Sequence, residues 1–493
     1  MQAILAIDQG TTNTKALLFD RTGAVVSRAS QPVGVTYPQP GWVEQDADVI
    51  WRSVTAAIDA CLLANPGVEV TALGLANQRE TAVVWDRATG RPIAPAVIWQ
   101  CRRTAAVCDR LQESGQEPEI RRRSGLAVDP LFSATKIRWI LEHVPDALAR
   151  AKNGELCAGN IDSWLLWKLT GGQVHATDFS NASRTQILNI STAQWDRELL
   201  EVFGVPVACL PTLRDSSGIY GVTEGTGTLP PGIPIAGVAG DSHAALFGHA
   251  AFAPGLVKAT YGTGSSLMSR VSGPLESANG LSTTVAWSID HQVQHALEGN
   301  ITNTGGAVEW FSGFLGLPGG AQEAAALAAS VDDSAGVYMV PAFAGLGAPH
   351  WDAHARGLFS GLTRGTTAAH AARATLDAIA YQVADVFRAF RQDSGIDCAA
   401  MLADGGASGN DQLMQFQADI IDCPVIRNES GDVAACGAAW LAGLATGFWQ
   451  SLEELETLPR SVRRFEPTMP AGRRAALLSG WADALHRCRT ASR

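Results

Sequence analysis

Three segments of the sequence place Gly, Thr and Ser beside Asp or Asn, close to the ends of apolar runs. They are residues 8–15 (DQGTTNTK), 262–266 (GTGSS) and 404–411 (DGGASGND). Closely spaced backbone N–H groups and hydroxyls bind phosphate oxygens, and a carboxylate such as Asp8 can hold Mg²⁺ beside them. One segment of this kind is more often an ordinary turn, but three together indicate a site for the phosphates of a nucleotide.

Two common nucleotide-binding signatures are missing from the sequence. It contains neither a G-x-x-x-x-G-K-[ST] phosphate loop nor a G-x-G-x-x-G segment after a strand. If the protein binds ATP, the Gly/Thr/Ser turns must therefore supply the phosphate contacts.

Short apolar runs of strand length flank the first two turns. Residues 3–7 and 16–19 predict a β-hairpin around the first turn, with a third strand at 24–30. Residues 256–261 and 267–270 repeat this pattern around the second turn. Because the two units lie far apart in the chain, the sequence predicts two related α/β lobes whose turns face a common cleft.

Helical patterns follow the strands. Apolar residues recur at helical spacing in 375–390, and 412–421 is amphipathic. The uncharged run 433–449 is shorter than the roughly 20 residues that a membrane span requires, so it predicts a buried packing helix. The Pro- and Gly-containing stretch 230–248 precedes the second unit and is interpreted as the crossing between the lobes.

Composition excludes several classes of protein. The 493 residues suit two or three domains, and 46% apolar residues allow a large core. A formal charge of −11 argues against nucleic acid or an anionic membrane as the main partner. Nine dispersed cysteines without C-x-x-C spacing predict neither a zinc site nor a redox motif, and no secretory signal is recognisable. These features predict a cytoplasmic protein.

Six segments in this order resemble the FGGY carbohydrate kinases, which share the fold of actin, hexokinase and the heat-shock chaperone ATPases. The segments are 8–15, 77–81, 98–104, 240–248, 260–264 and 405–410. The resemblance runs over almost the whole chain and is strongest to the glycerol-phosphorylating members. It implies an α/β fold of two ribonuclease H-like lobes with the active site in the cleft between them. Residues 1–248 would hold the polyol site and first phosphate turn, and 249–493 the second phosphate turn and adenosine site.

The resemblance also implies which residues contact ATP and Mg²⁺. Asp8 matches the metal-binding position. The remaining nucleotide positions are the phosphate contacts Thr11, Thr12, Lys15, Thr263 and Gly305, the adenosine contacts Gly406 and Asn410, and Glu309, where the family often has Gln.

Four further residues match the polyol-binding set of the family: Arg79, Glu80, Trp99 and Asp241. Asp241 matches the catalytic base. This assignment is chemically reasonable, because a carboxylate can orient a hydroxyl and take its proton, while Trp99 offers the carbon chain a flat apolar wall. Taken singly, Arg79 and Glu80 could be a surface ion pair, Trp99 a core residue and Asp241 a turn carboxylate; the other segments favour the site.

Two positions of the substrate pocket depart from the glycerol-phosphorylating members. Leu131 replaces a Tyr, and Ser242 replaces a Gln. Both changes remove polar reach, which predicts a roomier pocket. His243 either replaces a lost donor or faces away from the substrate; the sequence leaves both possibilities open.

The leading prediction is an ATP-dependent kinase for a primary hydroxyl of a small polyol, with glycerol first. An FGGY kinase for a longer polyol or ketose, such as erythritol, ribitol, xylulose or ribulose, is the alternative. A non-catalytic sugar sensor or chaperone-like ATPase is disfavoured, because Asp241 is retained and no long appendage follows Trp481. The resemblance further implies a homodimer or homotetramer.

Overall fold

The β-hairpin predicted at the start of the chain is confirmed. The computed structural model describes residues 1–490, in which β1 (Gln2–Gln9) and β2 (Asn13–Phe19) pair antiparallel. The third expected strand, β3 (Val25–Pro32), pairs with β2. On the other side of β1, the strands β5 (Glu69–Asn77) and β14 (Pro234–Gly240) continue the sheet in parallel.

The second half of the chain repeats this arrangement. Its strands are β15 (Leu256–Tyr261), β16 (Ser265–Val271), β18 (Gln292–Ile301), β21 (Ala400–Asp404) and β22 (Val425–Asn428). The order β18-β16-β15-β21-β22 matches β3-β2-β1-β5-β14, with the same parallel and antiparallel pairings. The prediction of two related α/β halves is therefore confirmed.

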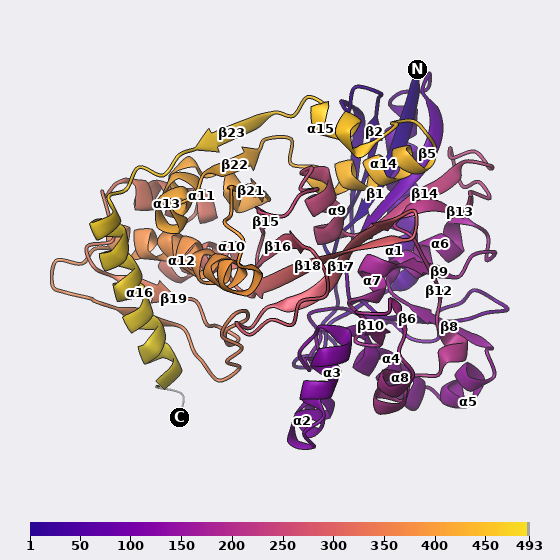
Figure 1. Ribbon diagram of the computed structural model, residues 1–493, viewed down its shortest axis with the longest axis horizontal. Coiled ribbons are helices and arrows are strands. Elements are labelled where there is room, and N and C mark those ends of the chain that lie inside the picture. The colour runs from indigo at the N-terminus through magenta and orange to yellow at the C-terminus, as the bar shows by residue number, and fades with distance from the viewer. Residues whose placement is uncertain (491–493) are drawn as a thin grey trace.

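One 13-stranded sheet passes through both halves. Its remaining members are β13 (Ser217–Val222), β17 (Ser282–Ile289) and β23 (Val462–Phe465). β13 and β17 join the halves through the single pair Ser217 and Ile289. In Figure 1 the strands β21, β22 and β23 of the second half lie to the left of the indigo strands of the first half.

Helices cover the sheet, and several short strands lie outside it. The helices of the first half are α1 (Ala47–Leu63), α2 (Ala105–Glu113), α3 (Glu117–Ser124), α4 (Ser133–His143), α5 (Ala147–Lys152), α6 (Ile161–Leu169), α7 (Phe179–Ala182), α8 (Arg197–Phe203) and α9 (Asp241–Gly248). Those of the second half are α10 (Gly305–Leu315), α11 (Gly320–Ala329), α12 (Ala368–Ser394), α13 (Asp411–Ile421), α14 (Val433–Ala445), α15 (Leu452–Thr457) and α16 (Ala471–Thr490). The short strands are β4 (Glu44–Gln45), β6 (Val83–Asp86), β7 (Ala96–Val97), β8 (Leu156–Gly159), β9 (Ala176–Asp178), β10 (Leu188–Asn189), β11 (Gln194–Trp195), β12 (Thr212–Arg214), β19 (Tyr338–Val340) and β20 (Leu358–Ser360). Within the described residues, no helix has the length and apolar character needed to cross a bilayer.

Both faces of the first-half sheet are buried, which explains the continuous apolar run of β1. All five residues from Ala3 to Ile7 are fully buried. Alternate side chains join a core with Ile50 and Val54 of α1 on one face and a core with Ala438 of α14 on the other. An unbroken apolar run is typical of a strand that is covered on both sides.

The helix α14 confirms the buried packing helix predicted from 433–449, and it belongs to the interface between the halves. It packs on β5, β14 and α9, and Figure 1 shows it beside the N-terminal strands. A Cβ atom added to Gly74 of β5 would stand 2.1 Å from the Ala438 carbonyl oxygen, so this packing requires glycine. The expected crossing at 230–248 needs correction, because β14 within it is an inner strand of the first half. The domain boundary after residue 248 stays a prediction.

Candidate active site

Asp241 begins α9 directly after β14, where a helix N-terminus favours negative charge. Arg79 Nε donates a hydrogen bond to Asp241 Oδ1 at 3.1 Å. The Asp241 side chain is 39% exposed, whereas that of Arg79 is 8% exposed. The Asp241 carboxylate is therefore the exposed partner of an ion pair whose cation is buried.

A chain of buried charges continues behind Arg79. Its Nη1 donates to Glu298 Oε1 at 2.6 Å, and the other oxygen of Glu298 lies 2.6 Å from Arg184 Nη1. Arg184 Nε in turn donates to Glu80 Oε1 at 2.7 Å. Burial by itself would raise the pKa of Glu298, but Arg184 and Arg79 outweigh it and hold that pKa far below its usual range. Alternating charges therefore fix Arg79 and Glu80 in one arrangement.

The backbone of Glu80 is also held in an unusual conformation. Its φ is +62°, in the left-handed region that residues other than glycine rarely adopt. The buried Lys136 Nζ donates to the Glu80 carbonyl at 3.0 Å and also to the Leu131 carbonyl. Burial lowers the pKa of Lys136 to about 8. This lysine brings the predicted pocket residues Glu80 and Leu131 together, and strained backbone of this kind clusters at functional sites.

The two residues after Asp241 differ in their surroundings. The buried Ser242 donates its backbone N–H to Asp241 Oδ1 at 2.6 Å. His243 is fully buried, and its Nε2 lies 3.1 Å from Thr284 Oγ1. Burial, followed by the nearby Arg79, lowers the His243 pKa well below its usual range. The sequence left two possibilities open for His243. The structure supports the second, in which the side chain faces away from the open site.

Trp99 joins the predicted polyol wall to the first phosphate turn. Its indole Nε1 donates to Thr11 Oγ1 at 2.9 Å, and its side chain is 36% exposed, so it is not a core residue. Within the described residues, Thr11 and Thr12 donate their backbone N–H groups to no protein acceptor. Gln45 Nε2 steadies the turn by donating to the Thr11 carbonyl at 2.8 Å. The turn thus presents free donors next to the tryptophan.

A buried network of amides connects this turn to the loop that carries Arg79. Gln78 donates its backbone N–H to the Gln9 carbonyl at 2.7 Å, and its Nε2 donates to the side-chain oxygens of Gln9 and Gln45. Thr81 Oγ1 donates to Gln78 Oε1 at 2.8 Å. All four of these side chains are at most 1% exposed. The phosphate turn and the Arg79 loop are consequently held as one unit.

Asp8 lies among carboxylates from both halves. Burial raises its pKa to about 6; Lys15 lowers it in part, while Asp241, Asp432 and Asp404 raise it further. Lys15 faces Asp8 across the hairpin, and its Nζ lies 3.3 Å from Asp432 Oδ1. The lysine predicted to meet phosphates is thus paired with a carboxylate in this structure. The described residues contain no group of three or more potential ligands placed to hold a metal ion by themselves.

The second phosphate turn packs against the start of α10. Gly305 donates its N–H to the Gly262 carbonyl at 3.0 Å, and the Thr263 carbonyl accepts from Thr304. A Cβ on Gly305 would lie 2.6 Å from the Gly262 oxygen, so the close approach requires glycine. Glu309 is exposed on the next turn of α10.

The third Gly-rich segment, residues 404–411, lies next to the start of α10. Gly406 is exposed at the start of a short 3-10 turn, and Asn410 Oδ1 caps α13 by accepting the Leu413 N–H at 3.0 Å. The Ala407 methyl lies 3.8 Å from where a Gly305 Cβ would stand. The predicted phosphate and adenosine residues of the second half therefore gather in one place.

Several buried charges of this region were not predicted from the sequence. They are Arg184, Glu298, Lys258, and the pair His249–Asp404, whose Nε2 and Oδ2 lie 2.7 Å apart. A usable signal was present for two of them. Lys258 and Glu298 are the only Lys, Arg, Asp or Glu residues of β15 and β18, and such charged residues are rarely fully buried unless they are paired.

The sequence is similar to a known protein family and to curated relatives over most of its length. Residues 3–248 match the N-terminal domain of the FGGY family of carbohydrate kinases, and residues 257–446 match the C-terminal domain. A glycerol kinase of Burkholderia ambifaria is 50% identical over 488 residues, covering 98% of this chain and 97% of that relative. A glycerol kinase of Carboxydothermus hydrogenoformans is 50% identical over 490 residues, covering 99% and 98%.

Solved structures agree with these sequence matches. The glycerol kinase of Plasmodium falciparum, crystallised with ADP, superposes with a TM-score of 0.93 at 32% identity, covering 99% of this chain and 98% of that chain. A ligand-bound xylulose kinase of Lactobacillus acidophilus gives a TM-score of 0.89 at 22% identity, covering 99% and 98%, and shows the same fold. The predicted fold class and family resemblance are both confirmed.

Proposed function

Because the chain belongs to the FGGY family of carbohydrate kinases, we propose that it transfers the γ-phosphoryl group of ATP to a primary hydroxyl of glycerol, giving glycerol 3-phosphate. The chain is a phosphotransferase with an alcohol group as acceptor, as its motifs predicted. Relatives at 50% identity that are named glycerol kinase support glycerol as the acceptor.

One observation carries the proposed chemistry. Asp241 is the exposed end of a chain of ion pairs whose other members, Arg79, Glu298, Arg184 and Glu80, have side chains at most 8% exposed. The inner charges hold Arg79, and Arg79 holds the Asp241 carboxylate toward the open side. A fixed, accessible carboxylate is what a general base for an alcohol requires.

In the proposed reaction, Asp241 accepts the proton of the attacking hydroxyl. As the O–H bond breaks, the substrate oxygen bonds to the γ-phosphorus, and the bond between that phosphorus and its bridging oxygen breaks to release ADP. Arg79 and Glu80 are proposed to hydrogen-bond the other hydroxyls. Trp99 is proposed to pack against the carbon chain, with Leu131 and Ser242 completing the pocket.

The nucleotide is proposed to lie between the Gly-rich turns of the two halves. The free N–H groups of Thr11 and Thr12 support a phosphate contact from the first half. The close packing of Thr263 and Gly305 supports one from the second. The family resemblance assigns further contacts to Lys15, Glu309, Gly406 and Asn410. When Lys15 contacts a phosphate, it would either leave Asp432 or keep it as a second partner.

Mg²⁺ is proposed to bind at Asp8 together with phosphate oxygens. Burial is the main cause of the raised pKa of Asp8, and Asp241, Asp432 and Asp404 raise that pKa further. The negative charge of these carboxylates, which a divalent cation would offset, supports this assignment. When bound, the ion neutralises charge on the β- and γ-phosphates. Asp8 itself would hold the ion near the end of β1, within the electrostatic influence of Asp241 from the first half and Asp404 from the second.

A longer polyol or a ketose is the second candidate acceptor. The observation that favours it is Leu131, which stands near Glu80 through their shared partner Lys136 and offers no side-chain hydrogen bond. A homodimer or homotetramer and a cytoplasmic location are also proposed, from the family resemblance and the dispersed free cysteines. Light scattering on the purified protein tests the oligomeric state.

The function is tested by measuring ADP release with glycerol, erythritol, ribitol, dihydroxyacetone, xylulose and ribulose as acceptors. The proposal expects glycerol to give the highest kcat/KM and requires ATP and Mg²⁺ for turnover. A higher kcat/KM for erythritol or a ketose would support the second candidate. ATP hydrolysis that no acceptor stimulates would contradict both.

A further inference from the structure

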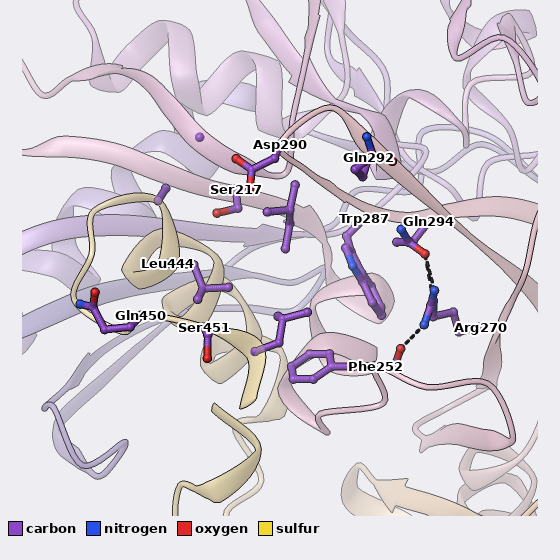
Figure 2. A pocket seen from close by; sticks show the side chains of 14 residues that line it. Ser217, Phe252, Arg270, Trp287, Asp290, Gln292, Gln294, Leu444, Gln450 and Ser451 are labelled. Carbon is purple, nitrogen blue, oxygen red and sulfur yellow. Dashed lines mark hydrogen bonds between the residues drawn. The ribbon is translucent and has the colours of Figure 1, made fainter. Parts of the chain in front are cut away.

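A cavity of about 540 Å³ lies where the two halves and the α14–α15 connection meet. Ser217 of β13, Trp287 of β17, Arg270 of β16 and Leu444 of α14 belong to its lining (Figure 2). Arg270 is at the end of β16 opposite to the second phosphate turn, roughly 20 Å from it along the strand. The cavity is therefore separate from the proposed active site, and its volume is in the range of small-molecule sites.

One wall of the cavity is aromatic. The rings of Trp287 and Phe252 lie with their centroids 6.1 Å apart at 82°, and Phe247 packs behind Trp287. Trp287 is 3% exposed and Phe252 is 7% exposed, so both rings are fixed by packing. Leu444 faces this wall from the α14 side (Figure 2). Rigid apolar walls of this kind suit a planar apolar ligand.

The other notable feature is a cation without a carboxylate partner. Arg270 Nε donates to Gln294 Oε1 at 3.1 Å, Nη2 donates to the same oxygen, and Nη1 donates to the Phe252 carbonyl. No carboxylate of residues 1–490 forms an ion pair with Arg270, and burial lowers its pKa. A guanidinium has five N–H donors, so two remain for a ligand. The exposed Asp290 lies next to Ser217, on the side of the cavity away from Arg270 (Figure 2).

We propose that this cavity is a second ligand site, for a small organic anion with an aromatic body. The anionic group pairs with the free donors of Arg270, and the ring packs against Trp287 and Phe252. Polar side chains at the margin, including Gln292, Gln450 and Ser451, supply further hydrogen bonds. The proposal does not depend on the kinase activity, because the cavity shares none of the residues assigned to that reaction.

The charge requirement is tested by calorimetric titration with 2-naphthoate and its neutral analogue 2-naphthamide. The wild-type protein is expected to bind the anion at least about tenfold more tightly than the amide. In Gln294→Glu, a carboxylate beside Arg270 neutralises the cation while keeping an acceptor for its N–H groups. This variant is expected to lose at least about tenfold in naphthoate affinity and to keep its turnover of glycerol.

Two further variants define the site. Gln322→Glu makes the same charge change on an exposed position of α11 and is expected to bind naphthoate like the wild type. Leu444→Trp fills the cavity without changing charge and is expected to abolish binding. Any one of three results would overturn the proposal. The first is equal affinity of the wild type for the acid and the amide, and the second is undiminished naphthoate binding by both Gln294→Glu and Leu444→Trp. The third is no binding of naphthoate to the wild type up to about 10 mM.

Discussion

Glu298 Oε1 lies 2.6 Å from Arg79 Nη1, although the two residues are 219 positions apart and belong to different halves of the chain. The same carboxylate also pairs with Arg184, so one buried acid neutralises two buried cations. The proposed base is therefore positioned from the second half of the molecule: Glu298 holds Arg79, and Arg79 holds Asp241.

Replacing Glu298 by Gln is expected to weaken both the fold and the site. Two buried guanidiniums then lose the carboxylate that they share and keep only one counter-charge each, which should lower the free energy of unfolding by about 3 kcal/mol. The kcat/KM for glycerol should also fall, because Arg79 is held less firmly. Urea unfolding and ADP-release kinetics measure the two effects. Glu201→Gln, at an exposed position paired with Arg197, is the matched control and should change the free energy by less than about 0.5 kcal/mol.

The contact between Trp99 and Thr11 predicts coupling between polyol and nucleotide. Trp99→Phe keeps an aromatic wall but removes the indole N–H, and Thr11→Val removes the acceptor. Each single change is expected to lower kcat/KM by about 2–10-fold through this bond. In the double variant the effects should be less than multiplicative, because the same bond can be lost only once. Strictly multiplicative effects would show that the bond does not contribute to turnover.

Leu131 is predicted to set the choice of acceptor. Leu131→Tyr adds a hydroxyl near Glu80, which should raise the ratio of kcat/KM for glycerol to that for erythritol by about 3–10-fold. Leu131→Phe supplies the ring without the hydroxyl and separates the effect of volume from that of the hydrogen bond. If Tyr and Phe change the ratio equally, the hydroxyl has no role in selection.

The fully buried Asp162 predicts a pH dependence of stability. Burial, followed by the nearby Asp178, raises its pKa to about 7, while the Thr177 hydroxyl donates to Oδ2 and partly opposes the shift. The pKa of an unfolded Asp is about 3.9, so between these two pKa values the folded state holds a proton that the unfolded state has lost. The free energy of unfolding should therefore fall as pH rises through this range.

Asp162→Asn removes this titration. From about pH 5 to about pH 8, the free energy of unfolding of the variant should rise by about 2–3 kcal/mol relative to that of the wild type. Urea unfolding of both proteins at the two pH values measures this change. Asp397→Asn, at an exposed position, should show no such gain. A difference between Asp162→Asn and wild type that does not change with pH would rule out Asp162 as the titrating group.

Local features of this fold could be predicted from the sequence, whereas long-range pairings could not. The apolar runs around 8–15 and 262–266 predicted both hairpins, because strand length and turn chemistry are local properties. The return of α14 onto the first-half sheet depends on small residues such as Gly74 that meet a helix more than 350 positions away, and no local pattern reveals it.

The candidate site likewise combines residues that the sequence could identify with residues that only the folded structure reveals. Motif positions such as Arg79, Glu80 and Asp241 could be assigned one by one, and the structure brings them together. Their supports, Glu298 and Arg184, lie in segments without a recognised motif, and only the folded chain pairs them. The burial of His243 likewise depended on the packing of α9 against β17, where Thr284 lies.

The most direct test of the proposed mechanism is the turnover of glycerol by Asp241→Asn. Asn keeps the size of the side chain and can still accept a hydrogen bond from Arg79, but it cannot take the proton of the substrate. The account predicts that kcat falls by about 10²–10⁴-fold while the affinity for ADP is unchanged. A variant that turns over glycerol at close to the wild-type rate would contradict the assignment of Asp241 as the base.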